Sequence, residues 1–373
     1  MTLSSTAPSR RLTTSMVKHK ILHNPLATLR RWWNGPVPAN NPPRLSLALQ
    51  GGGAHGAFTW GVLDALLEES DLDFDALSGS SAGAINAVVM TNGWIASGRQ
   101  GARQALSDFW LDVGKQIPWH LLTQGKGESI SLTPAAKTFA SWIGLFSPND
   151  FNPMAINPLR DVLNKQVDFE QIRRKSPFQL FVGATHVNTG KLRLFREHEL
   201  TADMVLASAC LPRIHHTVEI DGEPYWDGGF CANPAVFPLV QDGKSNDILL
   251  VLLAPHQHDE TPQTRAAIAS RIQELGFKTH FLREMNRYAR ELTGSTSLNK
   301  RWSVRTNELN RTRFHMIDSH LDVLQRSETK VLAYPPFLEM LRDQGRAQAK
   351  NWLAQHAASI GNRSSVNLAQ WLG

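Results

Sequence analysis

The chain has 373 residues, of which 42% are hydrophobic and 8% aromatic, so it can fold around a sizeable core and is not intrinsically disordered. Its two cysteines, Cys210 and Cys231, exclude a disulfide framework and favour a reducing compartment. No apolar run approaches the roughly 18 residues of a membrane-spanning helix, and no apolar segment follows the basic N-terminus as in a secretory signal. We therefore expect a cytoplasmic protein.

The net charge of +6 is carried by residues 1–43, which contain six basic side chains and no acidic one. The remaining residues have as many basic as acidic side chains, and no nucleic-acid partner is expected. The basic arm fits either a peripheral contact with an anionic membrane or a flexible, solvated tail. Prolines and asparagines at its end predict a linker, followed by a core over 44–260 and a mostly helical extension over 261–373 packed on that core.

The first predicted strand, 45–50, alternates like a half-buried strand and runs into a glycine cluster. Apolar side chains at helical spacing follow over 58–69. Glycines let backbone N–H groups point at an oxyanion without obstruction from side chains. The predicted oxyanion hole combines this cluster with the start of a later helix: Gly51, Gly52, Gly53, Ala54 and Ala82.

The second predicted strand, 74–78, ends in Gly79-Ser80-Ser81-Ala82-Gly83, which fits the pattern Gly-x-Ser-x-Gly. This pattern is typical of a sharp strand-to-helix turn that lifts a serine oxygen out of the sheet. Glycines stand where a Cβ would collide with the neighbouring backbone. Ser81 is therefore the candidate nucleophile, and residues 84–90 are the expected helix behind it, with free N–H groups at its N-terminal end.

The glycine cluster also satisfies a different motif. Gly51-x-Gly53-x-x-Gly56 matches the dinucleotide-binding fingerprint, with aspartates about 20 residues further on at 71, 73 and 75. That motif needs the acid at the end of the second strand, whereas these aspartates precede that strand or begin it. The serine motif occupies the place of the acid, so a dinucleotide site is the less favoured reading.

The rest of the chain continues to alternate helices and strands. Residues 116–151 are irregular and rich in aromatics, and fit either a cap over a pocket or an ordered excursion packed on the core. The other expected elements are helices at 98–113, from Asn157 onward, at 202–209, at 262–295 as one or two helices and at 336–356, and strands at 178–186, 192–195, 248–254 and 313–317.

A nucleophilic serine needs a general base within hydrogen-bond reach. If the order were Ser-Asp-His, the base would be a late histidine, and none of these stands in a distinctive motif: His256, His258, His315 and His320. His256, His258 and Asp259 are too few for a patterned metal site. We therefore expect no metal and no other cofactor.

Asp227 is the alternative base, because it precedes Gly228 and Gly229 in a tight turn at the end of a strand. Partial burial there would raise its pKa above the ordinary value of about 3.9 and make it a better base, while leaving it ionised at neutral pH. An isolated Asp-Gly-Gly is usually an ordinary turn. Its combination with the glycine cluster and the serine turn indicates a site.

These three motifs, in this order, resemble those of the patatin-like phospholipase family, and the resemblance extends from about Arg44 to Leu353. The segments similar to the family are 47–56, 79–83, 157–159, 207–212 and 227–229. The glycines that support the first, second and last of these motifs are Gly56, Gly79, Gly83, Gly228 and Gly229. Many members carry arginine or lysine before the last glycine of the first block, where this chain has His55.

The resemblance implies a three-layer α/β/α fold with a mostly parallel sheet and a Ser-Asp dyad, Ser81 and Asp227, that acts on acyl lipids through an acyl-serine. It implies no cofactor. The alternatives are a soluble carboxylesterase or thioesterase, a non-catalytic lipid-binding protein and, least favoured, a dinucleotide-binding protein.

Overall fold

The computed structural model describes residues 42–253, 261–293 and 304–371. The chain divides into two compact units, Met1–Asn40 and Asn41–Gly373, and every described residue belongs to the second. Residues 1–41 of the expected basic arm lie outside the described residues. So do Ala254, His256, His258 and Asp259.

Among the described residues, eight strands form one sheet in the order β10-β9-β1-β2-β5-β8-β7, with β6 also paired to β5. The strands are β1 Arg44–Leu49, β2 Asp73–Ser80, β5 Gln179–His186, β6 Leu192–Arg196, β7 Val218–Ile220, β8 Glu223–Asp227, β9 Asp247–Leu252 and β10 Arg313–Asp318. The pairs from β10 to β5 are parallel, whereas β6, β7 and β8 pair antiparallel. The loops that follow β1, β2 and β9 therefore meet at one edge of the sheet.

The helices of the described residues lie between and after these strands. They are α2 Gly56–Leu66, α3 Ala82–Lys115, α4 Trp119–Leu122, α5 Pro134–Ile143, α6 Pro148–Phe151, α7 Pro158–Gln166, α8 Phe169–Lys175, α9 Ala202–Ser208, α10 Phe237–Gln241, α11 Arg265–Thr293, α12 Val304–Arg311 and α13 Pro335–His356. Within the described ranges, none of the helices combines the length and the apolar character needed to cross a membrane.

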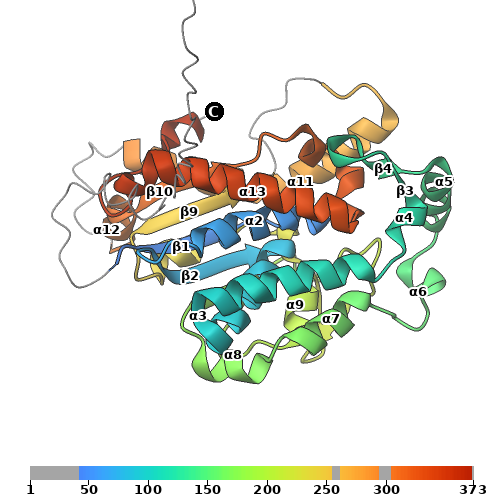
Figure 1. The fold of residues 1–373 in the computed structure, drawn as a ribbon, viewed down its shortest axis with the longest axis horizontal. Helices are drawn as coiled ribbons and strands as arrows, with labels where there is room; N and C mark the ends of the chain where they lie inside the picture. Colours follow the sequence, from blue (N-terminus) through green and yellow to red (C-terminus); the bar gives the residue numbers. More distant parts are fainter. Residues whose placement is uncertain (1–41, 254–260, 294–303, 372–373) are drawn as a thin grey trace, which may run out of the picture. The chain divides into compact units, whose positions relative to one another are not determined.

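Alternate residues of the central strands face opposite cores, as the period of a β-strand requires. Leu47 and Leu49 of β1 belong to a core shared with α2, α3 and α13, while Ala48 lies in a second core with α10 and α11. Figure 1 shows α13 and α3 in front of the strands. The fold is therefore α/β with a mostly parallel central sheet between two helical layers, as expected.

Several predicted elements have different bounds in the structure. The helices expected at 84–90 and 98–113 are parts of α3, which runs across a kink where Ser97 and Gly98 leave the helical conformation. The helix expected at 58–69 is α2, which begins and ends earlier. The strands expected at 178–186 and 192–195 are confirmed as the antiparallel pair β5 and β6.

Residues 116–151 form short regular elements, and Trp119 and Ile130 among them are buried in the core, which agrees with the ordered excursion that the sequence left open. They contain α4, α5, α6 and a short antiparallel pair, β3 Thr123–Gln124 and β4 Ser131–Leu132. The start of α5 has an ordinary local cause. Thr133 is its N-cap and accepts the N–H of Ala136 at 3.2 Å, and Pro134 occupies the first turn, where a missing N–H costs nothing.

Candidate active site

Ser81 lies on a sharp turn between β2 and α3. It has φ 56° and ψ −129°, a strained conformation for a residue with a side chain. Its N–H donates to the backbone and hydroxyl oxygens of Ser208 in α9, both at 3.0 Å. A Cβ at Gly83 would lie 2.1 Å from the carbonyl oxygen of Leu49, so only glycine fits where the turn crosses β1. A Cβ at Gly79 would meet the Gly83 backbone in the same way, at 2.5 Å.

The glycine loop after β1 lies directly against this turn. A Cβ at Gly51 would be 2.3 Å from the Ser80 carbonyl oxygen and 2.7 Å from Ser81 Cβ. Gly53 has φ +61°, a conformation that glycine adopts without strain. A Cβ at Gly56, at the start of α2, would lie 2.6 Å from that of Ala82. The predicted oxyanion segments are thus in contact with the serine turn.

The N–H groups of the loop differ in what they can still bind. Gly51 donates to Asn233 Oδ1 at 2.7 Å, and the amide of Asn233 donates back to Gly51 O at 3.3 Å. The Gly51 N–H is therefore already used, contrary to the sequence prediction. No hydrogen bond within the described part of the chain uses the backbone N–H groups of Gly52, Gly53, Ala54 and Ala82.

Asp227 ends β8 and is fully buried. Its Oδ1 accepts the N–H of Gly229 at 2.7 Å. Its Oδ2 has no hydrogen-bond partner of standard geometry among the described residues, although the Ser81 side chain lies close enough to lower the pKa of the carboxyl. Burial has the larger effect and raises the pKa of Asp227 to about 7, so the carboxyl titrates near neutral pH and is not fully ionised there.

The sheet register brings Asp227 to Ser81. Ser80 pairs with Gly183 between β2 and β5, and the next residue, Ala184, pairs with Asp227 of β8. A Cβ at Gly228 would lie 2.0 Å from the Gly183 carbonyl oxygen and 2.8 Å from Ser80 Oγ. The two turns therefore touch through positions that exclude side chains. Residues almost 150 positions apart meet at one point of the sheet.

The two late histidines that the structure describes, His315 and His320, lie near partners other than Ser81. His315 lies within β10, fully buried, between Ser365 Oγ and Asp247 Oδ1, each at 3.0 Å. His320 is exposed, 3.7 Å from Asp318. In the described residues no histidine is hydrogen-bonded to Ser81. Asp227 is the only one of the predicted bases in the described residues that adjoins the serine turn.

The His55 side chain binds another segment of the chain. It is buried, and its Nε2 lies 2.7 Å from Thr329 Oγ1 in the 3₁₀ turn Ser327–Val331. Burial, with the nearby charges of Lys330 and Arg326, holds its pKa well below the ordinary value. His55 is therefore neutral.

The aspartates of the dinucleotide motif lie at the wrong end of β2. Asp73 begins the strand and forms an ion pair with Arg99 at 3.1 Å, while Asp75 Oδ2 accepts the N–H groups of Lys244 and Ser245. A nucleotide on the glycine loop would sit at the other end of the strand. The geometry does not support that alternative.

Sequence reasoning missed three residues that hold or face the site: Ser208, Asn233 and Lys330. Ser208 lies in the small-residue segment 207–212, but its pattern gives no partner. Asn233 precedes a proline, which signals only a turn. Lys330 belongs to a segment without a motif.

The fold and site define an α/β protein with a strained serine at the carboxyl edge of a parallel sheet and a buried aspartate beside it. The family model for patatin-like phospholipase matches residues 47–240, more than half of the chain. The chain therefore belongs to the patatin-like phospholipase family, and its general activity class is that of a lipid acyl hydrolase.

Among solved structures, the chain is similar to the crystal structure of VipD from Legionella pneumophila, at 16% identity over 84% of this chain and 67% of that one, with a TM-score of 0.40. No curated protein matches the chain significantly.

Proposed function

We propose that this protein hydrolyses carboxylic esters of phospholipids or other acyl lipids, with Ser81 as nucleophile and Asp227 as general base. The observation that carries the proposal is the buried Asp227 carboxyl, whose Oδ2 has no hydrogen-bond partner of standard geometry among the described residues and whose pKa the neighbouring Ser81 side chain lowers. With a pKa near 7, the carboxyl can both accept and return a proton at neutral pH. A carboxylate also has no tautomer that a third residue would need to fix.

The reaction has two steps. Ser81 Oγ attacks the ester carbonyl carbon while Asp227 takes its proton, and the carbonyl π electrons move to the oxygen. The tetrahedral intermediate then collapses, its C–O bond breaks, and the leaving alcohol takes the proton from Asp227. A water molecule activated by the same carboxylate attacks the acyl-serine, and the fatty acid leaves as Ser81 regains its proton.

The N–H groups of Gly52, Gly53 and Ala82 are the proposed oxyanion donors. Gly52 and Gly53 follow Gly51, which contacts the serine turn, and none of the three N–H groups has an acceptor within the described ranges. Ala82 begins α3, where the helix dipole adds positive charge. Each such donor contributes on the order of 3 kcal/mol to transition-state stabilisation. Gly51 instead positions the loop through Asn233.

An exposed apolar surface supports a lipid substrate over a soluble ester. Its large side chains are Phe139, Trp142, Leu145, Phe146, Phe151, Met154 and Ile156, with Leu145 80% exposed and Met154 79%. Asp150 is the only charged residue between 138 and 159, and its carboxylate is bound by Ser147. A surface that is apolar and almost free of charge fits acyl chains better than a charged partner.

This apolar surface adjoins the site through one loop. His216 Nε2 lies 2.7 Å from the carbonyl oxygen of Asn152, and Cys210 O accepts the N–H of Asp227 at 2.8 Å. The loop between α9 and β7 thus contacts both the apolar segment and the turn that holds the base.

The test is release of long-chain fatty acid from phospholipid vesicles by the wild type, Ser81→Ala and Asp227→Asn, with folding checked by circular dichroism. We expect both folded variants to lose about 10³-fold or more in rate. Activity that survives Asp227→Asn would mean that another group is the base. A wild type that cleaves only short soluble esters would favour a carboxylesterase or thioesterase.

A further inference from the structure

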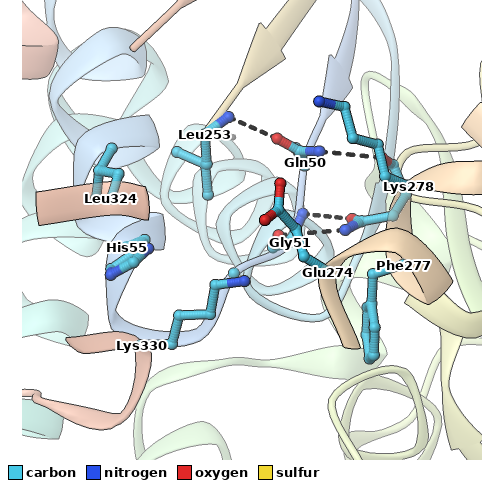
Figure 2. A pocket seen from close by; sticks show the side chains of 11 residues that line it. Gln50, Gly51, His55, Leu253, Glu274, Phe277, Lys278, Leu324 and Lys330 are labelled. Carbon is cyan, nitrogen blue, oxygen red and sulfur yellow. Dashed lines mark hydrogen bonds between the residues drawn. The ribbon is translucent and has the colours of Figure 1, made fainter. Parts of the chain in front are cut away.

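A lysine from the C-terminal part of the chain lines the cavity beside the glycine loop. The cavity measures about 20 Å³, and Gly51, Gly52, His55 and Lys330 are among its lining residues. In Figure 2 the Lys330 side chain extends from its ribbon toward Gly51. A space of this size holds about one water-sized atom. It can hold a single oxygen atom.

The position of Lys330 relative to the loop is fixed by the backbone. A Cβ at Gly53 would lie 2.3 Å from the Lys330 carbonyl oxygen, so the two chains are in direct contact. The hydrogen bond between His55 and Thr329 ties the same two segments together at 2.7 Å. The lysine is therefore held against the loop by two independent contacts.

The ammonium group of Lys330 has no hydrogen bond or ion pair with another described residue, although burial lowers its pKa below the ordinary 10.5. The charged and titratable groups that face it are Glu274 and Lys278 of α11, Asp227 of β8 and the neutral His55. The charges of Glu274 and Asp227 favour its protonated form. A largely buried positive charge is thus left for a ligand.

We propose that Lys330 supplies the positive charge of the glycine loop and stabilises the oxyanion that forms on the substrate carbonyl when Ser81 attacks. This inference rests on the proposed function. In the attack the carbonyl π electrons become a full negative charge on the oxygen, next to the N–H groups of Gly52 and Gly53. The positive charge faces that loop in a poorly solvated space, where electrostatic interactions are stronger than in water. It also faces Asp227, where it favours the ionised base.

The first test compares Lys330→Met, which keeps the length of the side chain, with Lys330→Arg, which keeps the charge. Hydrolysis of a short soluble ester at pH 7.5 is measured, so that membrane binding plays no part. We expect Lys330→Met to lower kcat by about tenfold or more with little change in KM, and Lys330→Arg to retain most of the activity. A Lys330→Met protein with kcat within twofold of the wild type would overturn the inference.

Glu328→Gln is the matched control. Glu328 lies two residues before Lys330 in the same turn, but it is exposed, and its ion-pair partner among the described residues is the surface residue Lys137 at 3.5 Å. Loss of such a pair has little effect. Its activity should equal that of the wild type, and an equal loss in both variants would show that the turn, not the charge, matters.

The pH profile separates charge from structure and needs only a folded Lys330→Arg protein. In the wild type, activity should fall in alkaline solution as Lys330 loses its proton, at a pH below 10.5 because burial lowers its pKa. Arginine stays protonated, so this fall should move to higher pH in Lys330→Arg. Unchanged alkaline behaviour in an active Lys330→Arg variant would contradict the inference.

The acid side gives a second readout. Lys330 lowers the pKa of Asp227, so its removal should move the rise of activity to higher pH in Lys330→Met. Labelling by a fluorophosphonate distinguishes a failure of the Lys330 proposal from a failure of the proposed function. If Ser81→Ala abolishes labelling while Lys330→Met labels at the wild-type rate, only the role of Lys330 fails. If Ser81→Ala is still labelled and active, the proposed function itself fails.

Discussion

Burial of Asp227 sets catalysis against stability. An ordinary aspartate carboxyl has a pKa of 3.8, whereas the pKa of Asp227 in the folded protein is about 7. The folded state therefore holds this proton more tightly than the unfolded state, and folding stability falls as pH rises from about 4 to 7 and stays reduced above. The same burial that suits the carboxyl to its proposed role as a base destabilises the protein at neutral pH.

Asp227→Asn should therefore be inactive and more stable. At pH 8 the variant avoids an ionised, buried carboxylate, and we expect its free energy of unfolding to increase by up to about 4 kcal/mol, from roughly three pKa units at 1.36 kcal/mol each. The gain should shrink toward zero near pH 3, about one unit below the ordinary pKa, where both states of the wild type are mostly protonated. Urea unfolding at the two pH values measures this difference. Equal free energies of unfolding of the two proteins at pH 8 would show that burial does not destabilise the ionised Asp227 carboxylate.

At the scale of elements, α5 and the residues after it, up to Ile156, carry the apolar surface. Phe139 and Trp142 stack with ring centroids 6.4 Å apart, and Trp142 meets Phe146 edge-on at 5.1 Å. These rings pack on one another yet remain exposed. Aromatic and aliphatic side chains in this arrangement enter the interface of a bilayer readily, with tryptophan near the headgroups.

Replacing Trp142 and Leu145 together by serine should weaken action on vesicles only. Each side chain that enters the bilayer contributes about 1.5 to 3 kcal/mol, so we expect at least about a tenfold loss of vesicle hydrolysis and unchanged cleavage of a short soluble ester. Parallel assays with both substrates measure the effect.

Ser141→Ala is the control for that pair, because it changes an exposed polar residue of the same helix and leaves the apolar side chains intact. It should match the wild type on both substrates. A double serine variant with undiminished activity on vesicles would mean that this surface does not contact lipid.

Elements with a strong local pattern were predictable. Alternation identified β1, and a continuous apolar run identified β9 up to Leu252. The helix at 134–143 was not predicted, because the segment was interpreted from its aromatic content. The N-cap Thr133 and the first-turn Pro134 do indicate a helix start. The sequence also predicted separate helices at 84–90 and 98–113, and α3 does leave the helical conformation between them, at Ser97 and Gly98.

The site was predictable only in part, for a physical reason. Ser81, Asp227 and the glycine loop carry local motifs, because each needs a turn that excludes side chains. Tertiary contacts bring Asn233 and Lys330 to the glycine loop, and nothing in the sequence around either residue indicates this. The orientation of His55 was likewise decided by a residue 274 positions away, Thr329.

At the scale of the whole described unit, one end of the sheet carries a buried hydrogen-bond network and the other carries the candidate site. At the ends where β2 and β9 begin, Asp247 binds Arg313, His315 and the N–H of Gly361. Burial would raise the pKa of Asp247, but these hydrogen bonds outweigh it and bring the pKa to about 2. Such a buried network stabilises the fold, while the serine, the glycine loop and Lys330 gather at the opposite ends.

The C-terminal part is structurally continuous with this core. It supplies β10 at the edge of the sheet, α13 against α2, and the turn that carries Lys330. We therefore propose that residues 261–373 complete the site as well as packing on residues 44–260.

The most direct test of the account is the rate at which a fluorophosphonate modifies the wild type and Asp227→Asn between pH 5 and 9, with the modified residue located by mass spectrometry. We expect one modified residue, Ser81, a rate of modification that rises as pH passes about 7, and a rate about 100-fold or more lower in Asp227→Asn. Modification at another residue, or an equal rate in Asp227→Asn, would contradict the claim that Asp227 activates Ser81.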